Sequence, residues 1–198
     1  MSTPQKDAFQ QFLDSPAGKF LAPKVGLPQP EKLRRYEKGE PALDGTVLVG
    51  GNGRLAESVK SLLSGDYDVT STAGEDKHAA LVFDATGIKR PEDLKEIYEF
   101  FQPVMRQIKP SGRILVLGTT PESIDDVDEH IVQRGLEGFT RSVAKELRRG
   151  ATAQLVYVDP AVSDDVRPAC AGLALGGAAC AIASRGGRRA PAPDPAVD

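Results

Sequence analysis

Short runs of residues that read as fully buried strands constrain this chain more than any other feature of its sequence. They alternate with helical patterns between residues 45 and 160, and they are Thr46–Val49, Tyr67–Thr70 (the weakest), Ala79–Phe83, Arg113–Leu117 and Leu155–Val158. A strand that is apolar throughout is buried on both faces, which is typical of a parallel sheet covered by helices. Right-handed crossovers leave few topologies for such a chain. We therefore expect an α/β fold with a doubly wound, five-stranded parallel sheet.

Three segments between these strands have apolar residues at helical spacing. The first is Leu55–Leu63, the second begins at Pro91 and turns Phe101 inward, and the third is the long Val127–Leu147. In doubly wound sheets, ligands bind at the carboxyl ends of the strands. The places to search for function are therefore the four segments that follow strands: Gly50–Gly53, Asp84–Gly87, Gly118–Thr120 and Asp159–Ala161.

A glycine-rich turn, GGNGRLAES, follows the first strand at Gly50–Ser58. Glycines at this place let backbone amides approach a phosphate at the start of a helix. A complete dinucleotide fingerprint needs three glycines at set positions, whereas Arg54 and Ala56 stand near the places of the later ones. Two interpretations remain, a phosphate site and a tight turn inherited from a nucleotide-binding ancestor. The missing glycines favour the inherited turn.

Four further motifs follow in order, and they are LVFDATGI (81–88), SGRILVLGTT (111–120), QRGLEGFTRSVAKELRRG (133–150) and AQLVYVDPA (153–161). In this order and spacing they resemble the short-chain dehydrogenase/reductase family. That family has an Asn-Asn-Ala-Gly strand end, a Gly-Arg-Ile strand that leads to a catalytic Ser, a Tyr-x-x-x-Lys helix and a strand that ends in Pro-Gly. The resemblance covers roughly Thr46 to Ala161.

The chain departs from this family at the catalytic positions. Counting back from Gly135 places Gln133 at the family's Lys and Glu129 at its Tyr, and Thr119 stands at its Ser. Carbonyl reduction in the family needs a phenol as proton donor and a lysine that lowers its pKa and holds the ribose of the cofactor. Glutamine carries no charge and a glutamate is ordinarily ionised at neutral pH. We therefore predict no catalytic residues; the alternative is a functional NAD(P)-binding short-chain oxidoreductase that acts on a carbonyl or hydroxyl substrate.

The spacing gives a second departure. Only about 25 residues separate Gly53 from Ala79, enough for one helix and one strand where the family has two strands. The strand order 3-2-1-4-5 thereby becomes 2-1-3-4-5, the flavodoxin-like order. The deletion also removes a wall from the adenine side of a dinucleotide site. The candidate cofactor residues are therefore vestigial, and they are Gly50, Gly51, Gly53, Asp84 and Gly87.

The arm KFLAPKVGLPQPEKLRRYEKGEPALDG joins these motifs in a narrower resemblance, over residues 18–160, to the N-terminal domain of high-molecular-weight 3-oxoacyl-acyl-carrier-protein reductases. In that group a degenerate flavodoxin-like domain precedes a complete NAD(H)-dependent ketoreductase domain. The resemblance implies a role in reducing 3-oxoacyl thioesters of acyl-carrier protein or coenzyme A. It also implies that the chemistry occurs in a second domain. This part would then supply homodimer contacts and help to shape the acyl entry region.

The two ends of the chain differ from its middle in composition and in pattern. We expect an arm at 1–44, with a short helix at Asp7–Leu13 and with prolines such as Pro16 and Pro23 that interrupt longer elements. The degenerate domain then spans 45–165. Ala, Gly, Pro and Arg dominate the tail, 166–198. A GC-rich gene that is read in the wrong frame yields such a composition, so we favour a frameshift near residue 165 over a natural low-complexity tail. The sequence allows a helix at Cys170–Ser184, and beyond it we expect disorder.

Composition excludes several classes of function. The chain has 25 Lys and Arg against 28 Asp and Glu, a net charge of -3, so we expect neither nucleic acid nor a membrane as partner. No apolar signal core starts the chain and no run approaches the roughly 20 residues of a membrane span, so we expect a cytoplasmic protein. Cys170 and Cys180 have no His partners at metal-ligand spacing. His78 and His130 stand among polar neighbours, which favours surface positions and no metal.

Two alternatives concern single motifs. Asp84 with Thr119 or Thr120 resembles the phospho-acceptor site of a signalling receiver, but the acidic pair and the Lys of such a site are missing. Asp84 is better interpreted as a cap for backbone amides at its strand end. The basic run Lys145–Arg149 ends the long helix, where cations suit the helix dipole. A docking patch for the acidic acyl-carrier protein is the other interpretation of this run.

Overall fold

The structure is a computed structural model, and it describes residues 11–12, 15–25, 43–74 and 76–161. The chain divides into two units, Met1–Arg35 and Tyr36–Asp198. The first unit contains helix α2 (Pro16–Val25), ten residues long. The prediction that Pro23 interrupts this segment was therefore wrong, whereas Pro16 bounds the helix. Pro16 occupies the first helical position, where its missing N–H has no intrahelical partner to lose, and Pro23 falls in the last turn. The predicted helix Asp7–Leu13 lies mostly outside the described residues.

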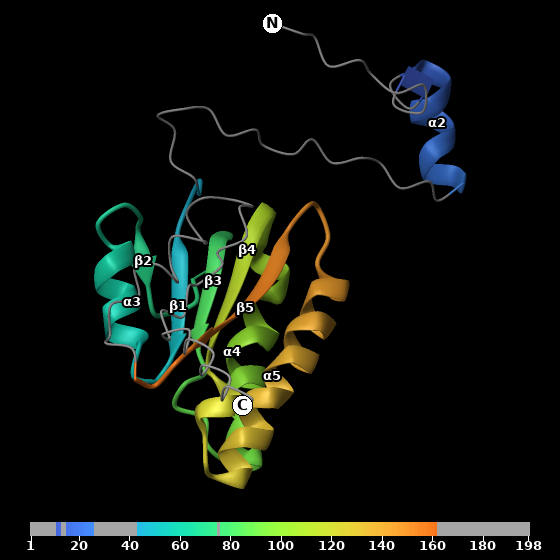
Figure 1. Ribbon diagram of the computed structural model, residues 1–198. Helices are drawn as coiled ribbons and strands as arrows, with labels where there is room; N and C mark the ends of the chain where they lie inside the picture. The colour runs from blue at the N-terminus through green and yellow to red at the C-terminus, as the bar shows by residue number, and fades with distance from the viewer. Residues whose placement is uncertain (1–10, 13–14, 26–42, 75, 162–198) are drawn as a thin grey trace, which may run out of the picture. The chain divides into compact units, whose positions relative to one another are not determined.

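A five-stranded parallel sheet forms the second unit, in the order β2-β1-β3-β4-β5 (Figure 1). Its strands are β1 (Val47–Gly51), β2 (Val69–Thr70), β3 (His78–Asp84), β4 (Ile108–Thr119) and β5 (Thr152–Val158). The predicted fold class and strand order are confirmed. Residues of β3 are buried along the whole strand, as expected for a central strand with helices on both faces.

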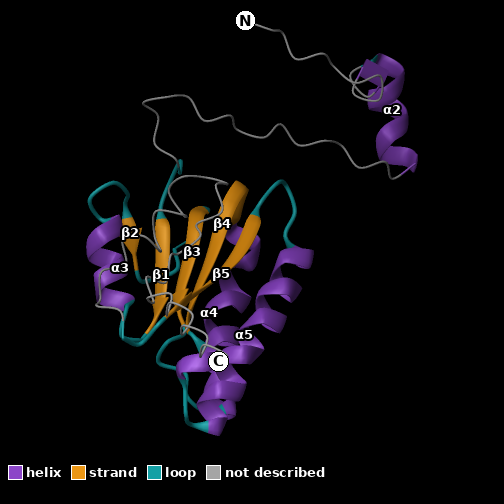
Figure 2. Ribbon diagram, viewed as in Figure 1, coloured by secondary structure: helices purple, strands orange, loops and turns teal. Residues whose placement is uncertain are grey.

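Helices cover both faces of the sheet (Figure 2). They are α3 (Ala56–Leu63), the short helix η1 (Pro91–Leu94), α4 (Lys95–Val104), η2 (Met105–Gln107), η3 (Pro121–Ser123) and α5 (Val127–Glu146). Pro91 starts η1, where its fixed backbone angle suits a first helical position, and Asp126 caps α5 by accepting from Glu129 N. None of the helices within the described ranges is long and apolar enough to cross a membrane.

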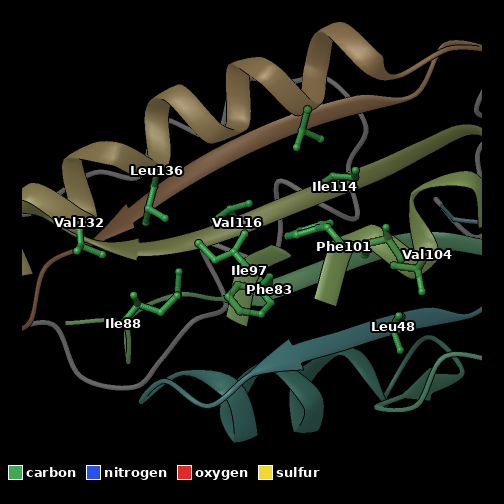
Figure 3. Packing of buried hydrophobic residues seen from close by; sticks show 13 residues of the cluster. Leu48, Phe83, Ile88, Ile97, Phe101, Val104, Ile114, Val116, Val132 and Leu136 are labelled. Carbon is green, nitrogen blue, oxygen red and sulfur yellow. The ribbon is translucent and has the colours of Figure 1, made fainter. Parts of the chain in front are cut away.

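Two apolar layers, one on each face of the sheet, make up the core. The layer on one face includes Leu55, Val59 and Leu63 from the first helical segment. The layer on the other face packs against α4 and α5, and Figure 3 labels ten of its residues: Leu48, Phe83, Ile88, Ile97, Phe101, Val104, Ile114, Val116, Val132 and Leu136. Phe83 lies at its centre, with ring centroids 5.1 Å from Phe100 and 5.9 Å from Phe101. These contacts fix α4 against the strands that carry the candidate site, and Phe101 contacts Phe139 of α5 with ring centroids 5.2 Å apart.

His78 corrects one prediction from the sequence. It was expected at the surface, but its side chain is only 2% exposed, on the first residue of β3. Its Nδ1 lies 3.0 Å from the hydroxyl of Thr46, a partner that a buried imidazole needs. Burial lowers the pKa of His78, and the nearby carboxylate of Asp76 opposes this less strongly. His130 is exposed, as predicted.

Candidate functional site

A cleft of about 430 Å³ lies at the carboxyl edge of the sheet, between the segments that follow β1, β3 and β4. Its lining residues are Asn52, Gly53, Arg54, Thr86, Gly87, Lys89, Thr119, Ser123, Ile124, Asp125, Asp126, Glu129 and Pro160. The parallel strands bring these segments together because all their carboxyl ends meet at one edge. The cleft is therefore at the place where the sequence predicts a ligand site.

Asp84 ends β3 and is only 1% exposed. Its carboxylate accepts hydrogen bonds from Leu55 N at 2.7 Å, Thr86 N at 3.0 Å and the hydroxyl of Thr86 at 2.7 Å. The prediction that Asp84 caps backbone amides at the strand end is confirmed. The bond to Leu55 N also places a carboxylate at the start of α3, where amide donors and the helix dipole attract anions. The protein thus fills the position that a ligand phosphate would take.

The glycines of the turn allow two loops to pack against each other. Gly51 has φ +87°, and a side chain on it would meet the backbone of Asp84. A side chain on Gly53 would meet the hydroxyl of Thr86 and the carboxylate of Asp84, and one on Gly87 would approach Gly53. Close approach is what glycine permits in nucleotide-binding turns. Here the neighbour that approaches is the protein's own loop after β3.

Arg54 joins the turn to the end of β5. Its backbone N–H donates to the hydroxyl of Thr86 at 3.1 Å. Its guanidinium Nη2 donates to the carbonyl of Asp159 at 2.9 Å and approaches that of Val158 at 3.4 Å. This cation therefore binds backbone carbonyls from a strand that is 105 residues away in sequence. It closes one side of the cleft.

Gln133 is fully buried, with 0% of its side chain exposed. Its Oε1 accepts from Thr119 N at 2.8 Å, and its Nε2 donates to the carbonyls of Ala85 at 2.8 Å and Ile88 at 2.9 Å. A buried amide needs partners at both ends, and this one has them. One side chain of α5 thus joins the ends of β3 and β4.

Tyr157 supports the same helix turn from β5. Its hydroxyl donates to the backbone carbonyl of Gln133 at 2.8 Å. Burial raises the pKa of Tyr157 to about 12, with a smaller contribution from the carboxylate of Glu137. The phenol therefore acts as a neutral donor to the helix backbone, and it is held outside the cleft lining.

Glu129 stands in the first turn of α5, and its side chain is 16% exposed. Its Oε2 lies 3.5 Å from Nζ of Lys89, whose own side chain is 66% exposed. An ion pair this open to water contributes at most about 1 kcal/mol to stability. The lining of the cleft also includes Arg54, Asp125 and Asp126, so two cations stand against three carboxylates there.

The structure brings together most residues that the sequence singles out. Thr119 and Gln133 are hydrogen-bonded, and Glu129 lines the same cleft as Thr119. Sequence reasoning missed the partners that complete these networks. Thr86 had a signal, since Asp-x-Thr after a strand favours a local turn. Tyr157 had none, because its partner is a backbone carbonyl of a distant helix. Within the described ranges, no group of three or more His, Cys, Asp or Glu side chains is placed to hold a metal ion.

The residues present do not fit the dinucleotide that the family resemblance implies. The N–H of Leu55 is bonded to Asp84, the N–H of Arg54 to Thr86, and the N–H of Thr119 to Gln133. A phosphate at the start of α3 would displace the Asp84 carboxylate or lie against it, and like charges at such a distance repel.

Comparisons with known proteins add little to this geometry. A scan against protein-family models and a search of curated proteins find no match. Among solved structures, the crystal structure of BdcA in complex with NADPH is similar over 58% of this chain and 70% of that chain. The sequence identity is 17% and the TM-score 0.40, an extent of likeness that says nothing about function. The Rossmann-like, flavodoxin-like assignment rests on the strand order itself.

Proposed function

We propose that this chain is a non-catalytic domain of a 3-oxoacyl-acyl-carrier-protein reductase-like short-chain dehydrogenase, with the chemistry in a separate ketoreductase domain. The observation that supports it most is the buried amide of Gln133, which ties Thr119 N to the carbonyls of Ala85 and Ile88. In a reductase of the resembled family, a lysine at this position holds the cofactor ribose. Here the position is used to join three segments of the protein to one another.

Glu129 lines the cleft and stands where the resembled family has its proton-donating tyrosine. A carboxylate such as Glu129 only accepts hydrogen bonds, and it faces the ammonium of Lys89. The half-buried phenol of Tyr157 donates to the helix backbone and has its pKa raised to about 12. A general acid works best with a pKa near the operating pH and within reach of the substrate. Tyr157 meets neither condition, since it does not line the cleft and its pKa is raised to about 12, which supports a structural role.

Assays of the purified chain with NADH or NADPH and a 3-oxoacyl thioester test the first half of the proposal. We expect no turnover above the rate of the enzyme-free mixture. The double variant Glu129→Tyr with Gln133→Lys is the matched control, because it restores both family side chains. We expect it to stay inactive, since a lysine at 133 would lack the acceptor for Thr119 N. Turnover by the natural chain would refute the proposal and favour a working oxidoreductase.

The nucleotide sequence of the locus tests the second half. A ketoreductase reading frame in another phase, downstream of the codon for about residue 165, would support a domain cut off from its catalytic partner. If no such frame follows the gene in any phase, the proposed link to 3-oxoacyl reduction is wrong. A cytoplasmic location and a homodimer belong to the same proposal, and light scattering of the purified chain measures the second.

A larger groove, of about 1430 Å³, bears on the expected acyl-carrier protein. It lies between α4 and α5, and its lining includes apolar Phe101 and Phe139 together with Lys145, Arg148 and Arg149. This placement supports the docking interpretation of the basic run beside its role at the helix end. Charge reversal at Arg148 and Arg149 should abolish binding of acyl-carrier protein if the groove receives it. Unchanged binding would leave the helix-dipole interpretation.

A further inference from the structure

The two edges of the sheet differ in how they are protected. At one edge, β2 has only two residues, and a short strand offers little to another chain. At the other, β5 runs for seven residues and pairs with β4 without interruption, from Arg113↔Thr152 to Thr119↔Val158. No strand among the described residues pairs with the outer side of β5. Its outward backbone groups form a row of donors and acceptors.

No residue of β5 is of a kind that prevents this edge from pairing with another strand. Thr152–Val158 reads TAQLVYV, without a charged residue or a proline, and its register with β4 shows no bulge. Soluble proteins ordinarily protect long edge strands with such features. We propose that the outer edge of β5 pairs antiparallel with β5 of a second copy of this chain, about a twofold axis at Leu155.

The strand is complementary to itself in this register. Leu155 faces Leu155 of the second copy, and Ala153 faces Tyr157, a small residue opposite a large one. On the other face of the sheet, Gln154 stands opposite Val156, so no like charges are opposed. Ala153, Leu155 and Tyr157 pack against one apolar layer of each copy and Val156 against the other, so both layers reach the junction.

Charges at the two ends of β5 favour the antiparallel arrangement. Arg148 and Arg149 precede the strand and Asp159 follows it. Antiparallel pairing brings the basic end of each strand beside the acidic end of the other, whereas parallel pairing would bring like charges together. A twofold axis also closes the assembly at two copies and avoids an open fibre. This inference rests on the sheet edge alone and holds whether or not the domain belongs to a reductase.

Cross-linking through single cysteines tests the register. In a Cys170→Ser, Cys180→Ser background, Leu155→Cys puts two thiols on the axis, about 4.5–5.5 Å apart at Cα, which suits a disulfide. Thr152→Cys is the matched control, because its two copies would lie about 20 Å apart at roughly 3.3 Å per residue. We expect mild oxidation to convert the Leu155→Cys chain mainly to a covalent dimer and to leave the control monomeric. Equal yields, or a dimer from the control alone, would overturn the proposal.

Hydrogen exchange on the natural chain is a second test, and it does not depend on whether a cysteine variant folds. We expect amides of Thr152–Val158 to become more protected as the protein concentration is raised, in step with dimer formation by light scattering. A monomer at all concentrations whose β5 amides are already protected would mean that another part of the chain covers the edge. Constant fast exchange would mean that the edge stays open. Either result refutes pairing with a second copy, and neither bears on the absence of catalysis.

Discussion

Replacing Gln133 by leucine tests whether this side chain holds the carboxyl edge of the sheet together. Leucine has a similar size and a higher helix propensity, so packing and helix formation change little. What changes is that Thr119 N and the carbonyls of Ala85 and Ile88 lose partners at 2.8, 2.8 and 2.9 Å, in a place where the side chain is 0% exposed. Water cannot easily replace a fully buried partner.

The expected magnitude follows from these three bonds. A buried donor or acceptor that loses its partner costs about 1–3 kcal/mol. The carbonyl of Ala85 keeps the N–H of Ile88 at 3.1 Å, so the change orphans one N–H and the carbonyl of Ile88. These two groups predict a loss of about 2–6 kcal/mol, reduced by about a third because apolar burial of leucine is favourable. A domain with ordinary stability of about 5–15 kcal/mol would keep its fold or come close to losing it.

Urea unfolding followed by far-ultraviolet circular dichroism measures the effect, since the chain has no Trp to report by fluorescence. The matched control is Gln102→Leu, the same chemical change at an exposed position of α4. We expect the control to stay within about 0.5 kcal/mol of the natural chain, as surface substitutions do. If Gln133→Leu is no less stable than Gln102→Leu, the buried amide does not hold the site together.

Three further predictions concern single ionisable groups. Asp84→Asn should lower the free energy of unfolding by about 1–3 kcal/mol, because the asparagine amide must turn an N–H toward groups that are themselves donors. Asp126→Asn, at the exposed cap of α5, is the control and should be nearly neutral in the same urea titration. Burial lowers the pKa of His78, so the unfolded chain takes up the proton before the folded one as pH falls. The contribution of neutral His78 to stability is complete above about pH 6.5 and is lost as pH falls below that. A titration of the free energy of unfolding against pH should lose this slope in His78→Leu. Burial raises the pKa of Tyr157 to about 12, so one of the four tyrosines should ionise late in a spectrophotometric titration, and stability should fall between about pH 10 and 12 in the natural chain but not in Tyr157→Phe.

The strands and helices of the sheet were predictable because their patterns are local. Runs such as Ala79–Phe83 and the long helix from Val127 were found within one or two residues of their ends. The start of β4 was missed by five residues, since Lys109, Pro110 and Ser111 do not read as a buried strand. Ser111 has φ +58°, and its N–H donates to the carbonyl of Arg149. That support comes from a distant turn and leaves no local pattern.

The candidate site was predictable in position but not in its contacts. Gly53, Asp84 and Thr119 meet because parallel strands share one carboxyl edge, which the sequence pattern fixes. Whether their donors face a ligand or one another depends on side chains that approach from other elements. Gln133 and Arg54 decide this in the structure, and neither has a neighbour in sequence that reveals its partner. The exposure of His78 was predicted wrongly for the same reason, because the hydroxyl that partners its buried imidazole belongs to Thr46, 32 residues away in sequence.

The predictions about the tail, 166–198, are tested by the nucleotide sequence of the gene. The expected frameshift near residue 165, the helix at Cys170–Ser184 and the disorder beyond it concern residues outside the described ranges. The boundaries 1–44, 45–165 and 166–198 therefore stay predictions, as does the absence of a bound cofactor.

Titration of the purified chain with NADH and NADPH, followed by nucleotide fluorescence, tests the central claim most directly. The claim is that Asp84, Gln133 and Thr86 occupy the donors that a dinucleotide would need. We predict no saturable binding up to millimolar nucleotide, for either compound. Saturable binding at micromolar concentration would contradict the account, because it would mean that the turn at Gly50–Gly53 still receives a dinucleotide despite these bonds.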